Sequence, residues 1–298
     1  MGKPVINPYI ALAIGVISVS TSAIFVKYST APTGVIAFYR LFFSVILMLP
    51  VFLLKYVSEL RLITKRDWIF SIVSGVFLAF HFILWFESLN YTSVASSTVL
   101  VTLQPLFAFV GTFVFFKEKL SLKEIISGII AVIGSVVISW GDFRISGNAL
   151  FGDILALIAC GLITAYLLFG QTVRKRVSLI TYTFVVYSIS SITLLLYVLA
   201  AHEPLIGFES DNWLYFFLLA LIPNLFGHTF LNWSIKWLST STISVAILFE
   251  PIGATILAVI LLSEEVLWTQ MVGGLIVLIG IMIFLVDVKR EKVKEATY

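Results

Sequence analysis

Long apolar stretches follow one another along the chain, and short polar loops separate them. A helix needs about 20 apolar residues to cross the hydrocarbon core of a bilayer. The stretches lack the alternation of apolar and polar positions that membrane strands show, so each one predicts a transmembrane helix. We predict ten such helices, at residues 8–27, 33–54, 68–89, 94–116, 124–140, 152–171, 180–200, 213–236, 242–262 and 269–287.

The composition agrees with a membrane protein and excludes a soluble one. Of the 298 residues, 60% are hydrophobic and only 12% are charged, and the mean hydropathy is +1.09. A soluble protein of this composition would have too few polar groups to cover its surface. The predicted fold class is therefore an all-α membrane protein whose excess apolar surface faces lipid.

The basic residues of the loops predict the orientation in the membrane. If the N-terminus is cytoplasmic, the inner loops and the C-terminal tail carry most of the lysines and arginines, and the outer loops carry only Lys27 and Arg144. This asymmetry follows the positive-inside rule. We predict a multi-pass protein of the plasma membrane with both termini in the cytoplasm and a first helix that is retained rather than cleaved as a signal peptide.

The second half of the chain repeats part of the first. Residues 88–133 align without gaps with residues 234–279, at an offset of 146 positions. Five spans in each half is an odd number, so the second copy enters the membrane upside down, as in many carriers. The predicted units are a first five-helix repeat at 1–145, a second at 146–288 and a basic cytoplasmic tail at 289–298.

The positions shared by the two halves also resemble a known family. Those that carry the resemblance are Trp85, Asn90, Tyr91, Thr92, Pro105, Glu118, Gly128 and Gly134, echoed by Pro251, Glu264, Gly274 and Gly280. In this set and order they resemble the EamA repeats of the drug/metabolite transporter superfamily. The resemblance covers essentially the whole chain and implies a ten-helix basket of two inverted repeats around a central cavity. It also implies a carrier of amino acids, other small metabolites, nucleotide sugars or drugs.

An acid inside an apolar span is the sharpest candidate for function. Glu250 precedes Pro251 near the middle of the ninth predicted helix. Insertion of such an acid costs roughly 2.5–3.5 kcal/mol, and intramembrane acids often relay protons. A neutral acid that bonds to a neighbouring helix is the structural alternative. Its partner in the repeat, Gln104 before Pro105, cannot titrate, so we predict that one half carries the ion chemistry and that both prolines bend their helices.

The eighth predicted helix carries a polar stripe. Asn224, His228 and Asn232 are spaced at i, i+4 and i+8 and therefore share one face. Pro223 removes a backbone donor and Gly227 leaves room for close approach, so a bend here would expose carbonyl groups to a cavity. The stripe can bind substrate and exchange protons through His228, or it can form interhelical hydrogen bonds of about 0.6 kcal/mol each.

The third and second predicted helices add a ring pair and a cation. His81 and Trp85 lie one turn apart on one face, where they can contact a substrate ring or cation or simply pack. Arg40 is the only basic residue well inside a span. An arginine is suited to bind a carboxylate of a substrate, and pairing with Glu87 or Glu250 is the alternative.

Hydroxyl groups and small residues complete the candidates. Thr164 and Tyr166 of the sixth helix can bind substrate or bond to their own helix backbone. Stripes of small residues in the fifth and tenth helices predict close helix packing. These stripes are Ser127, Ala131 and Gly134, and Gly273, Val277 and Gly280.

We predict a secondary transporter that exports a small metabolite such as an amino acid by alternating access, coupled to protons or to exchange. A broad-specificity efflux carrier for drugs or toxic compounds is the alternative. A membrane enzyme or a channel fits less well, because the chain has no H-E-x-x-H, G-x-S-x-G or C-x-x-C motif, no G-x-x-x-x-G-K-[ST] motif and no repeated filter loop. We therefore expect no catalytic residues, metal, cofactor or nucleic acid partner. The expected partners are the substrate, protons and the lipid bilayer.

Overall fold

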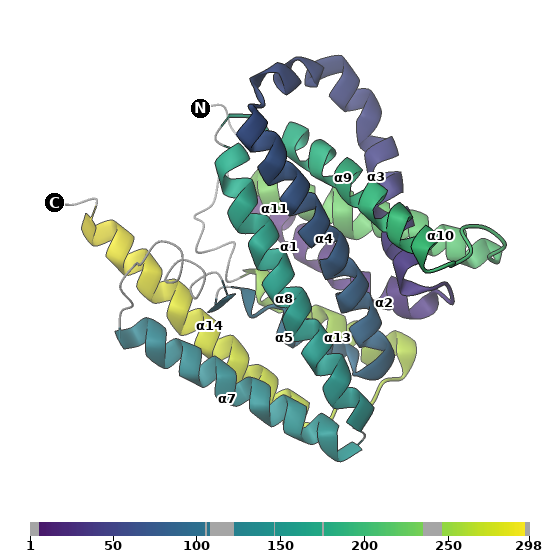
Figure 1. Cartoon of the computed structure of the whole chain (residues 1–298). Coiled ribbons are helices and arrows are strands. Elements are labelled where there is room, and N and C mark those ends of the chain that lie inside the picture. The colour runs from purple at the N-terminus through teal and green to yellow at the C-terminus, as the bar shows by residue number, and fades with distance from the viewer. Residues whose placement is uncertain are drawn as a thin grey trace.

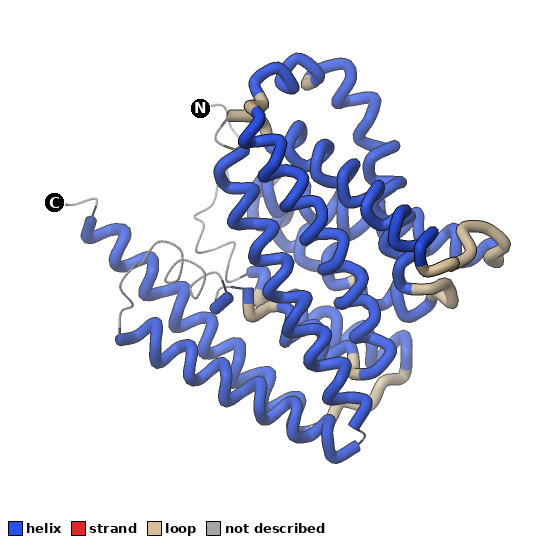
Figure 2. Tube along the Cα trace, viewed as in Figure 1, coloured by secondary structure: helices blue, strands red, loops and turns tan. Residues whose placement is uncertain are grey.

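A computed structural model of the chain describes residues 6–104, 106–107, 122–145, 147–174, 176–234 and 246–295. All regular elements in these ranges are helices (Figure 2). In the first half they are α1 (Pro8–Ser20), α2 (Ser22–Tyr28), α3 (Thr33–Lys55), η1 (Val57–Leu62), α4 (Lys65–Tyr91), α5 (Val94–Val101) and α7 (Leu122–Ile145). In the second half they are α8 (Gly147–Val173), α9 (Leu179–Ala200), α10 (Ser210–Leu219), η2 (Ala220–Gly227), α11 (His228–Ser234), α13 (Phe249–Leu262) and α14 (Trp268–Glu295).

The helices have the length and composition of membrane spans. In the described residues, six helical segments are long and apolar enough to cross a bilayer: Pro8–Tyr28, Thr33–Lys55, Lys65–Tyr91, Gly147–Gly170, Leu179–Ala200 and Ser210–Leu231. Ile125–Gly141, Phe249–Leu262 and Trp268–Ile283 are shorter apolar helices. Together these nine overlap nine of the predicted ranges, whereas residues 105 and 108–116 of the predicted helix at 94–116 lie outside the described residues. The chain thus folds as an all-helical membrane protein.

Large apolar side chains point away from the helix bundle. Ile17, Leu54, Ile260 and Met271 each expose more than half of their surface, with exposed fractions of 65%, 83%, 69% and 66%. In water such a surface would promote association, but it is the expected surface of a protein in lipid. The polar residues that remain inside the bundle therefore stand out as candidates for function.

Several helices are interrupted where the sequence predicts continuous spans. The predicted helix at 8–27 breaks at Thr21, whose hydroxyl donates to the carbonyl oxygen of Ser18 at 2.7 Å. Such a local bond competes with the helical pattern. Helix α13 begins at Phe249 after a turn at Leu248, so Glu250 lies in a first helical turn rather than in mid-helix. In the first half, α5 ends at Val101 and a turn follows at 102–103.

The eighth predicted helix contains a π-helical segment. Pro223 lies inside η2, and a proline cannot donate the backbone hydrogen bond that a regular α-helix needs. At the end of the same segment, a Cβ added to Gly227 would lie 2.7 Å from Cγ1 of Val19. The absence of a side chain at Gly227 therefore lets η2 pack closely against α1.

Helices α7 and α14 run antiparallel and side by side at one edge of the molecule (Figure 1). A Cβ added to Gly134 would lie 2.7 Å from both the carbonyl oxygen of Gly273 and the backbone nitrogen of Val277. One added to Gly280 would lie 2.9 Å from the carbonyl oxygen of Ser127. The close packing predicted from the two stripes of small residues is confirmed.

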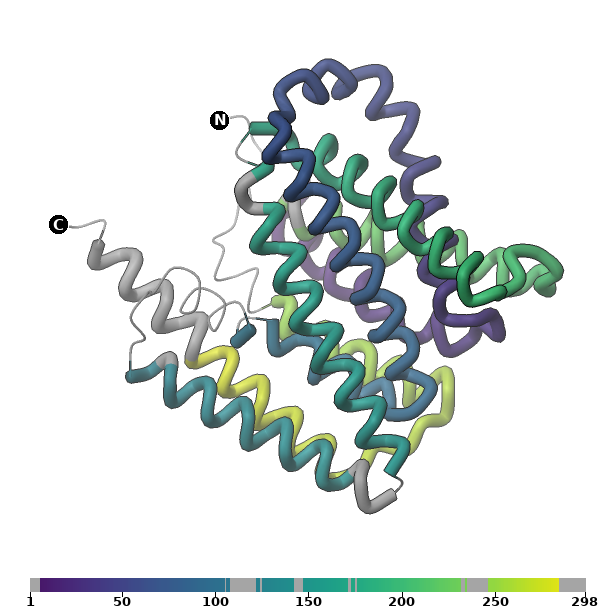
Figure 3. Tube along the Cα trace, viewed as in Figure 1, coloured from purple at the N-terminus to yellow at the C-terminus, as the bar shows by residue number. Residues whose placement is uncertain are grey.

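Helices from the two halves of the chain pack against each other throughout the bundle. Helix α4 lies along α8, α3 packs against α9, and α1 packs against η2 and α11 (Figures 1 and 3). Helices α5 and α13 are also in contact. The interior of the bundle is therefore formed jointly by both halves.

Candidate functional site

A cavity of about 680 Å³ lies between helices of both halves. Its volume is within the usual range of small-molecule sites, roughly 300–1,000 Å³. The structure brings most of the predicted site residues to its wall. These are Arg40, His81, Trp85, Gln104, Tyr166, Pro223, Asn224, His228 and Glu250.

Arg40 is the centre of a buried hydrogen-bond network. Its side chain is 3% exposed, and Nε and Nη2 donate to Oδ1 of Asn224 at 2.8 and 2.6 Å. Nη1 donates to Oγ of Ser22 at 2.7 Å. Asn224 is held in turn, because its Nδ2 donates to Oγ of Ser44 at 3.0 Å, and that hydroxyl donates to the carbonyl oxygen of Arg40. The network fixes the guanidinium of α3 against η2.

The predicted alternative partners of Arg40 are not its partners in the structure. Oε2 of Glu87 accepts instead from the hydroxyl of Thr33 at 2.9 Å. Glu250 lies within electrostatic range of Arg40, but the pair is not within ion-pair distance in the described residues. The guanidinium also lies 4.3 Å above the ring of Phe82, a favourable contact between a cation and an aromatic face.

His81 and Trp85 form a stacked pair on the wall that α4 contributes. Their ring centroids are 5.9 Å apart and the rings are inclined by 16°. Nδ1 of His81 lies 2.9 Å from the carbonyl oxygen of Ala159. Because a carbonyl oxygen can only accept, Nδ1 carries the hydrogen, and Nε2 of the neutral ring is an acceptor. Nε1 of Trp85 is buried and has no hydrogen-bond partner in the described part of the chain.

Glu250 lies at the start of α13, where the helix enters the cavity wall. The hydroxyl of Ser20 donates to the backbone carbonyl of Glu250 at 3.1 Å and to that of Val16 at 2.9 Å. Ser20 therefore ties α13 to α1. We did not predict a role for Ser20, although a hydroxyl group in an apolar span is a polar group in lipid.

The hydroxyl candidates of α8 differ in their surroundings. Thr164 donates to the carbonyl oxygens of Cys160 and Gln104, at 2.8 and 3.4 Å, and so links α8 to the residue that follows the turn at 102–103. Tyr166 lines the cavity, and its ring stacks on that of Tyr182 at a centroid distance of 6.2 Å. Thr164 thus bonds to backbone, whereas Tyr166 faces the cavity.

Two predicted residues cannot be placed. Pro105 and the side chain of Asn232 lie outside the described part of the structure. Asn224 and His228 of the predicted stripe both line the cavity, the first from η2 and the second from the start of α11.

The cavity also contains residues that we did not predict. Tyr182 and Tyr187 of α9 line it, and the hydroxyl of Tyr182 donates to that of Ser74 at 3.2 Å. Tyrosines inside an apolar span are polar groups in lipid, so the criterion that selected Arg40 could have selected them too. Ser44 belongs to the Arg40 network rather than to the cavity lining, and its spacing of one helical turn after Arg40 was the available signal.

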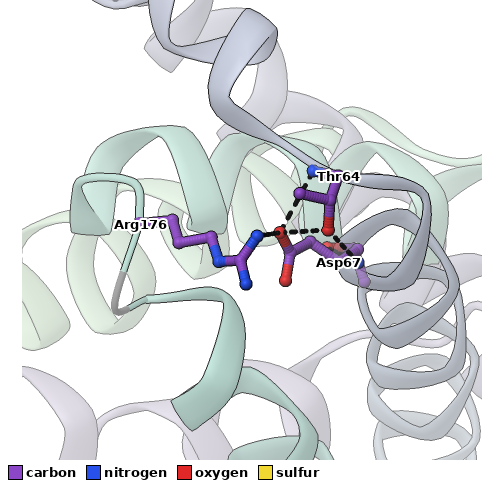
Figure 4. A network of polar contacts seen from close by, with 4 residues as sticks. Thr64, Asp67 and Arg176 are labelled. Atoms are coloured by element: carbon purple, nitrogen blue, oxygen red, sulfur yellow. Dashed lines mark hydrogen bonds and ion pairs between the residues drawn. The ribbon is translucent and has the colours of Figure 1, made fainter.

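One end of the cavity reaches the region where α8 ends and α9 begins. Arg174, Leu179 and Thr183 line it there. Beside this end, Arg176 forms an ion pair with Asp67 at 3.3 Å, and Asp67 forms a capping box with Thr64 at the start of α4 (Figure 4). These contacts join loops of the two halves.

Glu59 of η1 makes a second connection at this end. Its Oε2 accepts from the backbone nitrogen of Ser178 at 2.8 Å and from the hydroxyl of Thr181 at 2.7 Å. Burial raises the pKa of the Glu59 carboxyl, but these hydrogen bonds outweigh that effect and the pKa lies below its ordinary value.

Hydrogen bonds close the bundle at the opposite end. Nζ of Lys27 donates to the carbonyl oxygen of Leu89, and the hydroxyl of Tyr39 donates to that of Leu205, both at 2.7 Å. Oε1 of Glu264 accepts from the first backbone nitrogen of α5, that of Val94, at 2.8 Å. The residues that form these three hydrogen bonds are not among the described residues that line the cavity.

A second hollow of about 690 Å³ lies on the outside of the bundle. Its wall is almost entirely apolar and is formed by residues that follow α5, including Leu106, and by residues of α7 and α8, including Trp140 and Leu157. Such a surface fits lipid tails better than a polar substrate. In the described residues, His, Cys, Asp and Glu do not form a group of three or more that could hold a metal ion.

A polar, charged cavity inside an all-helical membrane protein is typical of a transporter. Residues 7–140 and 150–286 each match the EamA-like transporter family, and the chain belongs to this family, part of the drug/metabolite transporter superfamily. The family's members are transporters, so the protein is a transporter and not an enzyme.

Relatives agree with this family, and a solved structure shares the fold. The chain is 26% identical to the uncharacterized transporter YxxF of Bacillus subtilis (strain 168) over 227 residues, which are 75% of this chain and 71% of the relative. An uncharacterized transporter of Archaeoglobus fulgidus is 23% identical over 276 residues, 92% of this chain and 94% of the relative. A protein whose crystal structure is known is 17% identical to this chain, and the two structures match with a TM-score of 0.64. The match covers 95% of this chain and 98% of the other, which shows a shared fold.

Proposed function

We propose that the chain is a secondary active transporter that exports a small metabolite, such as an amino acid, across the plasma membrane by alternating access. The observation that carries this proposal is the cavity itself. Helices of both halves line it, and Arg40 and Glu250 both lie on its wall without an ion pair between them. Among the described residues, the lining extends to the end of the bundle where α8 ends and α9 begins. A site between two half-bundles can face either side in turn when one half rocks against the other.

The proposed architecture is ten helices in two inverted repeats, with units at 1–145 and 146–288 and a basic tail at 289–298. Contacts that exchange under the 146-residue offset support it. The contact of Gly134 with Gly273 has its counterpart in that of Gly280 with Ser127. Likewise α4 packs against α8 as η2 and α11 pack against α1. The turns at 102–103 and at Leu248 also correspond under this offset.

The proposed orientation makes this an inward-facing state. The end that the cavity reaches carries the basic loops with Arg174 and Arg176, which belong in the cytoplasm under the positive-inside rule. Bonds such as that of Lys27 to Leu89 close the outer end and must break for release outside. Both termini are then cytoplasmic.

We assign proton coupling to Glu250, with His228 as the neighbouring titratable group. Both line the cavity, and both lie within electrostatic range of Arg40. A carboxyl group that is open to the cavity can take up a proton from one side and release it to the other as access alternates.

Efflux of aromatic drugs is a second candidate. The rings of Phe82, Trp85, Tyr166, Tyr182 and Tyr187 line the same cavity and could contact a planar apolar compound. The buried charge of Arg40 favours the first candidate, because an apolar cation would meet a like charge there.

Counterflow in proteoliposomes tests the proposal. Vesicles that contain the purified protein are loaded with a mixture of unlabelled amino acids, and the entry of each labelled amino acid is followed. Unlabelled substrate inside a carrier vesicle accelerates entry of the label, whereas a channel shows no such effect. The same measurement is made with a labelled aromatic drug cation. Counterflow of this cation, together with no counterflow of any amino acid, would favour the second candidate.

A further inference from the structure

The positive charge of Arg40 is oriented by its neighbours but is not neutralised by them. Its three hydrogen bonds go to neutral oxygens, those of Asn224 and Ser22. Within the described part of the chain, Arg40 has no carboxylate at ion-pair distance. A buried charge without an ion-pair partner is unfavourable, so an anionic group bound directly beside Arg40 would be stabilised there.

The network also leaves part of the guanidinium available to a ligand. A guanidinium carries more N–H donors than the three that Asn224 and Ser22 occupy. The ring of Phe82 supports one face of the group at 4.3 Å, and Arg40 lines the cavity. The fork is therefore held in place before a ligand arrives, which lowers the entropic cost of binding.

Trp85 supplies a second unused hydrogen-bond donor, next to the phenylalanine rings on which the guanidinium lies. The guanidinium covers Phe82 and Phe86, and the indole of Trp85 packs on Phe86 with centroids 5.3 Å apart. Trp85 is 5% exposed and lines the cavity, and its Nε1 has no acceptor among the described residues. An indole nitrogen can only donate, so this position too requires an acceptor.

We propose that Arg40 and Trp85 form an anion subsite in the cavity and that the transported substrate carries a carboxylate. The inference deepens the proposed function and rests on it. One carboxylate oxygen would accept from the guanidinium and the other from the indole N–H, a charge-assisted pair of bonds. Arg40 is the cation of this subsite, since Arg174 lines the cavity at the end where α8 ends and α9 begins. One cation matches the single charge of a carboxylate, whereas a phosphate dianion would require a second cation beside Arg40.

Acids paired with their own amides test this assignment, because each pair differs in charge but hardly in shape. The unfolding midpoint of the purified full-length protein is measured against acetate, benzoate, 4-methylpentanoate, L-leucine and L-phenylalanine, against the primary amide of each, and against inorganic phosphate. Binding to the folded state raises the midpoint. We expect acids of the panel to raise it and their amides to have no effect.

Two variants place the effect in the subsite. Arg40→Gln should weaken binding of the acids about 30-fold and Trp85→Phe about 5-fold, as expected for loss of a charged and of a weaker hydrogen bond. The control is Arg66→Gln, since Arg66 also stacks on a ring, that of Phe70, but lies outside the cavity lining. If Arg40→Gln does not fold, Trp85→Phe decides the question.

The assignment would be overturned if the amides bind as well as the acids, or if none of the carboxylic acids binds, whether or not phosphate does. It would also be overturned if Arg40→Gln and Trp85→Phe bind the acids as tightly as the wild type does. The counterflow experiment separates this failure from that of the proposed function. A protein that exchanges amides and acids equally is still a carrier, but it has no anion subsite. Acid binding without counterflow keeps the subsite and removes the transport cycle.

Discussion

Replacement of Asn224 by aspartate should weaken the binding of carboxylates in the cavity and leave the fold intact. Oδ1 of Asn224 accepts from Nε and Nη2 of Arg40 at 2.8 and 2.6 Å. Asn224→Asp has nearly the same shape, but it brings a permanent carboxylate to this position. The variant therefore supplies internally the counter-charge that we assign to the substrate.

The size of the effect follows from the geometry. Opposite charges about 4 Å apart attract by about 4 kcal/mol at an effective dielectric constant of about 20. If the resident aspartate removes half of this attraction, an incoming carboxylate loses about 2 kcal/mol, which is about 30-fold in affinity. The unfolding midpoint should not fall, because the new ion pair offsets the desolvation of the new charge.

Asn224→Leu is the matched control. It keeps the volume of the side chain but leaves two buried donors of Arg40 without an acceptor, at a cost of about 1.5–3 kcal/mol for each charged hydrogen bond. The two bonds together cost about 3–6 kcal/mol, and its midpoint should fall by roughly 6–24 °C, since 1 kcal/mol shifts a domain of 150–250 residues by about 2–4 °C.

Thermal unfolding with and without the acid that binds the wild type best measures both quantities, and counterflow reports transport. Two results would refute the reasoning. The first is an Asn224→Asp protein that binds acids like the wild type. The second is one that unfolds as early as Asn224→Leu.

Further predictions concern coupling, packing and pH. Glu250→Gln should flatten the pH dependence of transport while counterflow continues, and an unchanged pH profile would remove Glu250 from the coupling role. Gly134→Ala should destabilise the protein by about 1–3 kcal/mol, because the new Cβ would meet backbone of α14 at 2.7 Å. Gly128→Ala is its control on the same helix, because among the described residues a Cβ there would meet only Leu106, at 3.9 Å, so this variant should be neutral or stabilising. Equal unfolding midpoints of the two variants would contradict the packing. Because the pKa of Glu59 is lowered on folding, its contribution to stability is present above the ordinary value of 4.5 and is lost as the pH falls through the lower folded value. Unfolding midpoints between pH 7 and about pH 3 should therefore fall less in Glu59→Gln than in the wild type, and parallel curves would contradict this.

Features that depend on neighbouring residues in the chain could be predicted from sequence. Helical spans follow from the length of apolar runs, and the small residues that allow α7 and α14 to pack follow from a repeat of three and four positions. The selection of Arg40, His81 and Glu250 as candidates followed from the cost of polar groups in lipid. The structure places all three on one cavity.

The partners of these residues were not predictable in the same way. Asn224 and Arg40 are 184 positions apart, and the sequence offered Glu87 and Glu250 as equally reasonable partners. The interruption of the ninth predicted helix at Leu248 was also missed, because an apolar run looks the same whether or not it contains a turn.

The sequence alone thus determined that the protein is a bundle of membrane helices with a few costly polar groups inside. Composition and run length suffice for that, because lipid demands them of every span. Only the tertiary structure decided that the charge of Arg40 is held by neutral oxygens rather than by an acid. The physical reason is that side-chain partners are chosen by the packing of helices distant in sequence, and local patterns do not encode this packing.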